Sequence, residues 1–551
     1  MHVLHANKTR VAMVTLVAIQ LIVMILFSMQ KIGYHMDEIL SYGLANSYFD
    51  PFITSEEQYG MEWYTSEELQ DYLTVDNQDR FSYDSVVYNQ EQDVHPPLWY
   101  ALFHTINSCF FVGVFSKWSG IILNLICFIC IDIVLYFFAK QISSSRAIAV
   151  LSVLIWGFSL GAINMVTFIR MYALLTLWTI LFVYLHSCLL NHATIQSGKI
   201  SSKLLLGLIV VTILGILTQY YFLIFTFFIC GLWCVYLLWK KKWKILIQYS
   251  CGELFAVIFC VIVFPAMIKH IFSGYRGEAA FSALAESEAW TEHLKTYLSI
   301  FSHSIVWGCL KLLSILAILF LIYWVIQNFF MKFEVHYNNQ SHELKVTGRR
   351  CDSIKLQWAL PSQCAFYIIV ATACIAYFLM ITRIAPYQAD RYIMPLFPIV
   401  AVYMANMLCW IGKRYFPKRG MAIIIALCVV LSCISWKVGP YNYLFLDNAA
   451  RNEITAQYED LPVIVLYSAR WKGTVFADEL AEHPAVFFCE ADNLTNLEEK
   501  LHEQDISNGF LLYTESDDDQ AIKNFMELFA DGIELEKMTN VRGNIYLVEG
   551  A

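Results

Sequence analysis

Two adjacent carboxylates, Asp37 and Glu38, follow the first long apolar run of this 551-residue chain. Asp93 and His95 close the same polar segment, directly before a Pro-Pro pair. A carboxylate can take a proton from an attacking hydroxyl group, and histidine changes its charge near neutral pH. We therefore take Asp37 and Glu38 as the candidate catalytic residues of a group-transfer reaction at the edge of an apolar segment.

Further polar residues stand at the ends of later apolar runs. The candidate substrate-binding residues are Asp93, His95, Arg170, Tyr172, Gln219, Tyr220 and Arg391. Arginine holds phosphate through paired hydrogen bonds and offsets the charge that develops on a leaving phosphate. The set predicts transfer from a phosphorylated donor to an acceptor.

Each of these residues also has a structural interpretation. The acid pair could cap a helix that begins near Ile39, and His95 with the prolines could form a turn and a helix start. The arginines could reach lipid headgroups, and Gln219 and Tyr220 could belong to an aromatic interface belt. The functional interpretation is favoured because all of these residues are predicted on one side of a membrane.

The composition predicts the membrane. Hydrophobic residues make up 58% of the chain and charged residues 15%, whereas soluble domains are roughly half apolar and a quarter charged. The apolar residues gather in runs long enough to cross a hydrocarbon core of ~30 Å. The predicted spans are 11–30, 118–139, 147–165, 170–189, 203–218, 220–239, 246–267, 305–330, 363–381, 392–411 and 421–438. We expect an all-α polytopic membrane protein with about 11 transmembrane helices, since lipid cannot satisfy open backbone groups.

Lysines and arginines predict the orientation. They gather before the first span and in every second loop after it, as in Lys240–Lys244, and such loops face the cytoplasm. The N-terminus is then cytoplasmic, whereas the long acidic first loop 31–96 and all the candidate site residues are outside. The first span is too long for a signal peptide and is expected to be retained. The segment 97–116 is apolar but short, so we expect an interfacial helix on the outer surface.

The C-terminal segment 441–551 differs in character from the span-rich segment 1–440. It is rich in Asp and Glu and poor in Lys and Arg. Strands are predicted at 461–467, 509–513 and 544–548, and helices at 493–504 and 519–530. We expect a small soluble extracytoplasmic α/β domain with an accessory or acceptor-contacting role, since it carries no glycine-rich phosphate loop or catalytic serine motif.

Other polar groups are weaker candidates. Cys127 and Cys130 form a CxxC inside a span without a partner pair, which disfavours a metal or redox role. Asp132 and Glu253 also fall within spans, where ionisable groups are functional candidates by default, but they lie apart from the outer set. No metal-ligand spacing occurs in the sequence. The acids of the first loop could still bind a divalent cation, so this alternative is kept. Nothing indicates nucleic-acid binding.

Four motifs in fixed order carry a resemblance to a known family. They are the Asp37-Glu38 pair, His-Pro-Pro-Leu-Trp-Tyr from His95, Arg-Met-Tyr-Ala-Leu from Arg170, and Arg-Tyr from Arg391 followed by Pro-Leu-Phe-Pro. Over residues 1–440 this set resembles the dolichyl-phosphate-mannose protein mannosyltransferases and lipid A aminoarabinose transferases, which are GT-C type glycosyltransferases (family 39-like).

The resemblance implies an inverting glycosyltransferase. Its donor would be a polyprenyl-phosphate-linked sugar, and its acceptor a cell-envelope glycan, lipid or protein at the outer face of a bacterial plasma membrane. One carboxylate of the acid pair would act at the acceptor site as base or orienting group, and we favour Asp37 as the base. The chain departs from the family in its long acidic first loop, in Thr167-Phe168-Ile169 before Arg170, where relatives carry an acid, and in Trp99, where eukaryotic members have lysine. The sugar and the acceptor remain open.

Two other classes are consistent with some features of the sequence. A transporter or flippase would show internal repeats and ionisable groups near the bilayer midplane, and neither is evident. A structural or sensory membrane protein would use the outer tail to bind a partner, but it would leave the spacing of the acids, His95 and the arginines unexplained.

Overall fold

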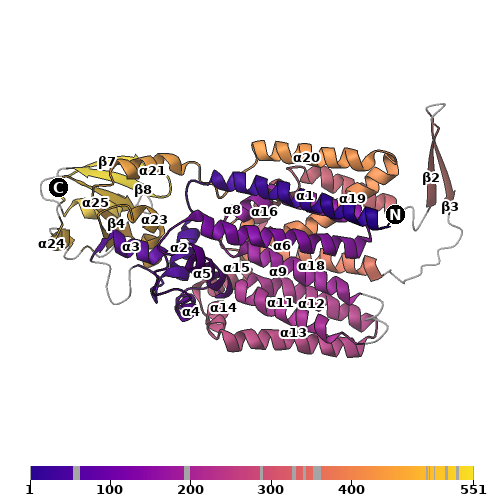
Figure 1. The fold of residues 1–551 in the computed structure, drawn as a ribbon, viewed down its shortest axis with the longest axis horizontal. Coiled ribbons are helices and arrows are strands. Elements are labelled where there is room, and N and C mark those ends of the chain that lie inside the picture. Colours follow the sequence, from indigo (N-terminus) through magenta and orange to yellow (C-terminus); the bar gives the residue numbers. More distant parts are fainter. Residues whose placement is uncertain are drawn as a thin grey trace.

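The computed structural model describes residues 2–53, 62–190, 199–285, 290–325, 331–338, 343–350, 362–491, 494, 497–501, 503–504, 506–514, 519–528 and 533–549. Apolar helices form a bundle along the long axis, and a sheet-containing domain caps one end (Figure 1). Within the described residues, eight helices are long and apolar enough to cross a membrane. They are α1 (His2–Met29), α6 (Lys117–Ser143), α9 (Tyr172–Leu189), α12 (Tyr221–Trp239), α13 (Trp243–Val263), α18 (Ser362–Ile384), α19 (Phe397–Tyr415) and α20 (Gly420–Val438).

Two bent helix pairs raise the number of spans to ten. The first pair, α7 (Arg146–Gly157) and α8 (Leu160–Thr167), bends by 57°. The second, α16 (Trp290–Ile305) and α17 (Leu310–Val325), bends by 88°. The apolar helix α11 (Ser202–Thr218) is shorter, with 17 residues. These elements match the predicted spans, with one exception: α16 precedes the predicted span 305–330, which corresponds to α17. Residues 326–330 of that span lie outside the described residues. The prediction of an all-helical multi-pass protein is confirmed.

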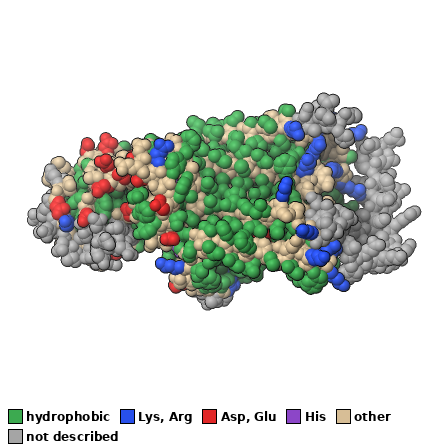
Figure 2. All heavy atoms as spheres, turned by 60° about the horizontal axis from the view of Figure 1, so that its bottom comes forward, with side chains coloured by type: hydrophobic (Ala, Val, Ile, Leu, Met, Phe, Trp, Pro, Cys, Tyr) green, Lys and Arg blue, Asp and Glu red, His purple; other side chains and the backbone are tan. Residues whose placement is uncertain are grey.

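The two ends of the bundle differ in charge. Lys and Arg side chains gather at the end that holds the N-terminus, whereas Asp and Glu gather over the domain at the other end (Figure 2). A hairpin of β2 (Met331–Asn338) and β3 (Glu343–Arg350) extends from the basic end. We call these the basic end and the acidic end.

Short helices between the bundle and the domain build the acidic end. They are α2 (Met36–Asn46), α3 (Ser66–Leu73), α4 (Tyr83–Gln92), α5 (Leu98–Phe110), α14 (Ala266–Phe272), α15 (Tyr275–Ala285) and the 3-10 turns η2 (Asp390–Tyr392) and η3 (Met394–Leu396). Helix α5 falls inside the predicted interfacial helix 97–116. It buries Trp99 and Phe103 and leaves Phe110 77% exposed. Its place at the membrane surface stays a prediction.

The domain contains a six-stranded sheet with the order β1-β5-β4-β6-β8-β7. Its strands from the C-terminal segment are β4 (Val463–Tyr467), β5 (Ala485–Glu490), β6 (Phe510–Thr514), β7 (Glu534–Thr539) and β8 (Asn544–Glu549). Helices and turns cover them: α21 (Asn448–Gln457), α22 (Arg470–Gly473), η4 (Thr474–Phe476), α23 (Ala477–Leu480), α24 (Leu497–Leu501) and α25 (Asp519–Met526). Strands β5, β4 and β6 are parallel, and β8 and β7 continue the sheet antiparallel.

The three predicted strands correspond to β4, β6 and β8. The predicted helix 493–504 is wrong in length, because α24 holds five residues; residues 493, 495–496 and 502 lie outside the described residues. The predicted helix 519–530 corresponds to α25, and residues 529–530 are likewise not described.

The sixth strand comes from the first loop. Strand β1 (Trp63–Thr65) pairs antiparallel with β5, with Thr65 opposite Ala485. The Trp63 indole N–H also donates to the Lys500 carbonyl oxygen at 2.9 Å. The sheet is therefore built from both ends of the chain.

Candidate active site

Helix α2 begins with a capping box that uses Glu38. The His35 ring accepts from the Asp37 N–H at 3.0 Å, and Glu38 accepts from the His35 N–H at 2.7 Å. Glu38 is fully buried, accepts from the Ile169 N–H at 2.7 Å and pairs with Lys31 Nζ at 2.8 Å. The capping interpretation of the acid pair therefore holds for Glu38, whose two oxygens are both engaged inside the protein.

Asp37 lies in a different environment from its neighbour. Its Oδ2 accepts from Arg391 Nη1 at 2.7 Å, and its side chain is 22% exposed. Burial alone would raise the pKa of Asp37, but Arg391 and then Arg170 outweigh burial and hold the pKa below its usual range. Asp37 is therefore an ionised carboxylate at neutral pH, oriented by an arginine from a distant segment of the chain.

Arg170 connects three elements of the site. It stands in the tight turn between α8 and α9, and its Nη1 donates to Ser41 Oγ and to Tyr100 Oη, both at 2.8 Å. Its Nη2 lies 3.2 Å from His95 Nε2. His95 Nδ1 lies 2.6 Å from Asp93 Oδ2. Since arginine only donates, His95 accepts through Nε2 and carries its proton on Nδ1, toward Asp93.

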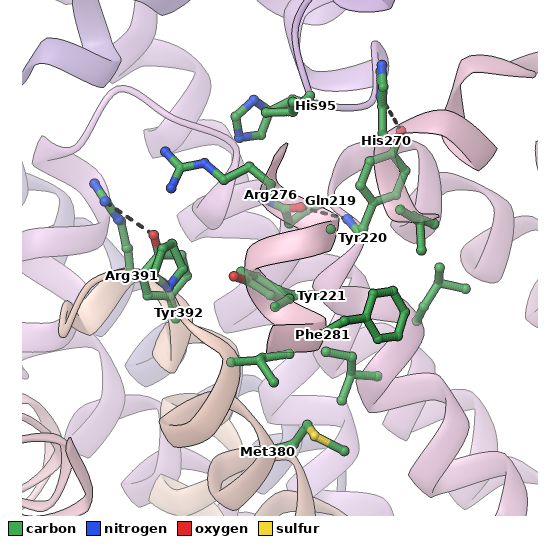
Figure 3. A pocket seen from close by; sticks show the side chains of 18 of the residues that line it. His95, Gln219, Tyr220, Tyr221, His270, Arg276, Phe281, Met380, Arg391 and Tyr392 are labelled. Carbon is green, nitrogen blue, oxygen red and sulfur yellow. Dashed lines mark hydrogen bonds between the residues drawn. The ribbon is translucent and has the colours of Figure 1, made fainter. Parts of the chain in front are cut away.

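A cavity of about 330 Å³ opens beside these residues. Seven of the nine residues selected from the sequence line it: Asp37, His95, Arg170, Tyr172, Gln219, Tyr220 and Arg391. The other two, Glu38 and Asp93, do not line it. Asp93 is bonded directly to the cavity residue His95, and Glu38 is bonded to Ile169, the neighbour of Arg170. Figure 3 shows charged side chains at one side of the cavity and Phe281 and Met380 at the other.

Several cavity residues were not selected from the sequence. The most notable is Arg276, which lies in the first turn of α15, directly after α14. Its guanidinium carbon lies 5.4 Å from the Tyr387 ring centre. The Arg391 guanidinium lies 5.9 Å from the same ring centre, so the two cations face one region of the cavity (Figure 3). Tyr220 Oη bonds to His270 Nδ1 at 2.9 Å. Arg276 belongs to none of the motifs found in the sequence, so no spacing signal identified it as a site residue.

The segment that leads into the C-terminal domain is bonded to the site. The buried Asp390, next to Arg391, accepts from Tyr443 Oη at 2.6 Å, Asn442 Nδ2 at 2.9 Å and Asn164 Nδ2 at 3.0 Å. The Tyr443 ring stacks on Phe168 at 4.0 Å, and its carbonyl oxygen accepts from the Lys31 ammonium. We call residues 440–444 the latch segment. It bonds to Asp390, the neighbour of Arg391, and to Lys31, the partner of Glu38.

The other polar groups considered in the sequence lie outside the cavity. Glu253 bonds to Thr212 Oγ1 at 2.7 Å, and among the described residues Asp132 finds no hydrogen-bond partner for its carboxyl oxygens. Cys127 and Cys130 are free thiols. Over the described ranges, no group of three or more His, Cys, Asp and Glu could hold a metal ion. A divalent cation stays a prediction.

The fold and this site together define a multi-pass membrane protein with a GT-C fold. The fold is that of ArnT from Cupriavidus metallidurans bound to undecaprenyl phosphate, with a TM-score of 0.55, 8% identity and 98% of each chain covered. The apo structure of the same ArnT matches with a TM-score of 0.50 and 9% identity, over 93% of this chain and 97% of that one. No protein-family model and no curated protein matches the chain. The resemblance stated from the sequence motifs is thus confirmed in the fold.

Proposed function

We propose that the protein is an inverting glycosyltransferase that moves a sugar from a polyprenyl-phosphate donor to an acceptor outside the membrane. One observation carries the proposal: the cavity joins a carboxylate and three arginines to an apolar side formed by residues such as Leu223, Ile224 and Met380. A lipid-linked phosphate has this same polarity. The ArnT structure that shares the fold holds undecaprenyl phosphate.

Phosphate binding is assigned to the arginines. Arg276 and Arg391 face one region of the cavity, and guanidinium groups hold phosphate oxygens through paired hydrogen bonds. Of the two, Arg391 is also bonded to Asp37. A donor phosphate that binds Arg391 would compete for this bond and would leave Asp37 a stronger base once the donor is in place.

The transfer step follows from these positions. The acceptor hydroxyl oxygen attacks the anomeric carbon, and Asp37 takes its proton. The bond between the anomeric carbon and the phosphate oxygen breaks, and the phosphate leaves with the electron pair, stabilised by the arginines. A single displacement inverts the anomeric configuration. Glu38 is a positioning residue, since its pair with Lys31 fixes the start of α2.

The test is transfer by the purified protein with a panel of labelled polyprenyl-phosphate sugars. We expect at least one donor to be consumed, with polyprenyl phosphate released and an inverted glycoside formed. Asp37→Asn should lower the turnover number roughly 10²–10⁴-fold, as loss of a general base does. Donor binding by this variant should persist, because Asn keeps the shape of the side chain.

A second variant separates binding from chemistry. Arg276→Gln should raise the KM for the donor about tenfold or more, because a charge-assisted phosphate contact is lost. Arg80→Gln is the matched control: the Arg80 guanidinium lies over the Phe81 ring, and Arg80 does not line the cavity. Full turnover by Asp37→Asn would contradict the assignment of the base. Flipping of a labelled lipid without any sugar transfer would favour a transporter instead.

A further inference from the structure

The cavity of the candidate active site carries more positive than negative charge. Its charged lining residues are Asp37, Arg170, Arg276 and Arg391. Three guanidinium groups and one carboxylate leave two positive charges in excess. No further Asp or Glu lines the cavity in the part of the chain that the structure describes. Asp93, which does not line it, is bonded to His95 Nδ1 at 2.6 Å. A ligand that enters this cavity therefore meets an excess of cations.

The one carboxylate of the cavity is already engaged. Asp37 Oδ2 accepts from Arg391 Nη1 at 2.7 Å, and Arg170 Nη1 donates to the Asp37 carbonyl oxygen at 3.2 Å. Arg276 has no carboxylate partner among the described residues; it lies against tyrosines, with its guanidinium carbon 5.4 Å from the Tyr387 ring centre. The charge that is left for a ligand is thus positive. Apolar side chains form much of the cavity wall, so water screens this charge less than at an open surface.

Neutral polar side chains occupy another part of the same cavity. Tyr220 Oη lies 2.9 Å from His270 Nδ1, and His270 Nε2 lies 3.4 Å from the Glu91 carbonyl oxygen. A carbonyl oxygen only accepts, so Nε2 carries the ring proton and the Tyr220 hydroxyl donates to Nδ1. Burial lowers the pKa of His270, so the ring is uncharged at neutral pH. Gln219, next to Tyr220, is also uncharged (Figure 3). Sugar hydroxyl groups can bond to such side chains without bringing a charge of their own.

We propose that the donor sugar is a neutral, hydroxyl-bearing sugar and that the cavity discriminates against a sugar with an ammonium group. This inference rests on the proposed function and narrows its donor. The phosphodiester of the donor carries one negative charge, and the phosphate that leaves carries close to two at neutral pH. The two positive charges in excess therefore match the leaving phosphate. An ammonium group would be held beside the arginines, and such like-charge contacts exclude wrong partners.

The test uses the full-length protein in detergent and three farnesyl-phosphate-linked sugars: glucose, 2-deoxyglucose and glucosamine. They differ only at C2, the carbon next to the anomeric carbon and therefore close to the phosphate. Dissociation constants are measured by isothermal titration calorimetry. We expect the glucose donor to bind at least tenfold more tightly than the glucosamine donor. The 2-deoxyglucose donor should also bind more tightly than the glucosamine donor, because it lacks the hydroxyl group without gaining a charge.

Gln219→Glu reverses the preference by adding a negative charge to the cavity. Glutamate keeps the side-chain oxygen that accepts from the Tyr220 N–H at 2.7 Å. In this variant the preference for glucose over glucosamine should fall at least tenfold. Gln78→Glu is the matched control: Gln78 is exposed and does not line the cavity, so the preference should change less than twofold.

The outcomes separate this inference from the proposed function. Glucosamine binding as tight as glucose binding in the wild-type protein would overturn the inference and leave the proposed function in place. Equally weak binding of 2-deoxyglucose and glucosamine would also overturn it, because the lost hydroxyl group and not the charge would then explain the preference. Failure of all three donors to bind would count against the proposed function, and the inference would fall with it.

Discussion

Asp37 and Glu38 are neighbours in the sequence with different structural roles. Successive residues of a helix point about 100° apart, so Glu38 turns into the protein toward Lys31 while Asp37 faces the cavity and Arg391. The sequence identified the pair and favoured Asp37 as the base, but it could not show that Glu38 is engaged inside the protein, because the partners of both residues are set by the folded chain. Arg276 was not predicted as a site residue for the same reason, since only the folded chain brings it near Arg391.

His95 predicts a pH dependence of the reaction. Burial lowers the pKa of His95 below 6.5, with Asp93 opposing this shift and Arg170 adding to it. His95 is then neutral at pH 7 and accepts from Arg170. As the pH falls below 6.5, an unfolded chain takes up the proton before the folded one does, so His95 lowers stability toward acid. Once His95 itself is protonated, the bond with Arg170 is lost. We expect kcat/KM to fall on an acid limb below pH 6.5.

His95→Gln tests this assignment. Glutamine can still offer an oxygen to Arg170 but does not titrate, so the acid limb of kcat/KM should move to lower pH in the variant. The wild-type protein, measured in the same buffers, is the reference. Acid limbs that coincide in the two proteins would mean that another group controls the profile.

Among the elements, the latch segment 440–444 has the clearest energetic consequence. Tyr443→Phe keeps the stacked ring on Phe168 and removes one of three donors to Asp390. Loss of a donor that leaves a buried acceptor unsatisfied costs about 1–3 kcal/mol. We expect a lower unfolding temperature, and turnover reduced about tenfold because Arg391, next to Asp390, loses its fixed position. Thermal unfolding and the transfer assay measure the two effects.

Tyr441→Phe is the control for the latch. Its hydroxyl donates to the Trp436 carbonyl oxygen and does not reach Asp390. This variant should keep wild-type turnover. A similar loss of turnover in both variants would indicate general destabilisation rather than a specific effect on Arg391.

The membrane helices could be predicted because hydrocarbon imposes both their length and their apolarity. The bend between α7 and α8 could not, since it occurs at Phe158-Ser159 within an unbroken apolar run, where the Ser159 hydroxyl accepts from the Ala162 N–H and starts a new helix. In the domain, β4 and β6 were evident as buried apolar runs. Strand β1 was not, because a three-residue strand has no periodicity to detect.

At the scale of the whole molecule, the composite sheet joins the first loop to the C-terminal domain. Directly opposed residues of an antiparallel pair have Cα atoms about 4.5–5.5 Å apart, which suits a disulfide. Thr65→Cys with Ala485→Cys should therefore form a cross-link on mild oxidation, detected by mass spectrometry of the digested protein. Transfer activity should persist, because the cross-link preserves the observed register.

Thr65→Cys alone controls for the lost helix cap, since Thr65 accepts from the Glu68 N–H. The single variant should lose about 1 kcal/mol of stability, as the reduced double variant does, because both lack the Thr65 cap. It should form no cross-link to β5. Failure of the double variant to cross-link under oxidising conditions would mean that β1 does not remain in the sheet.

The shared sheet also has a consequence for biosynthesis. Ribosomes add roughly 5–20 residues per second, so β1, Asp37 and Lys31 leave the ribosome tens of seconds before β5, Arg391 and the latch segment that complete their surroundings. A nascent or truncated chain therefore lacks an assembled candidate active site. In such a chain β1 has no partner strand, because β5 is not yet present. We expect activity to appear only after synthesis of the chain is complete. We also expect β1 to be the segment that chaperones bind before β5 is made.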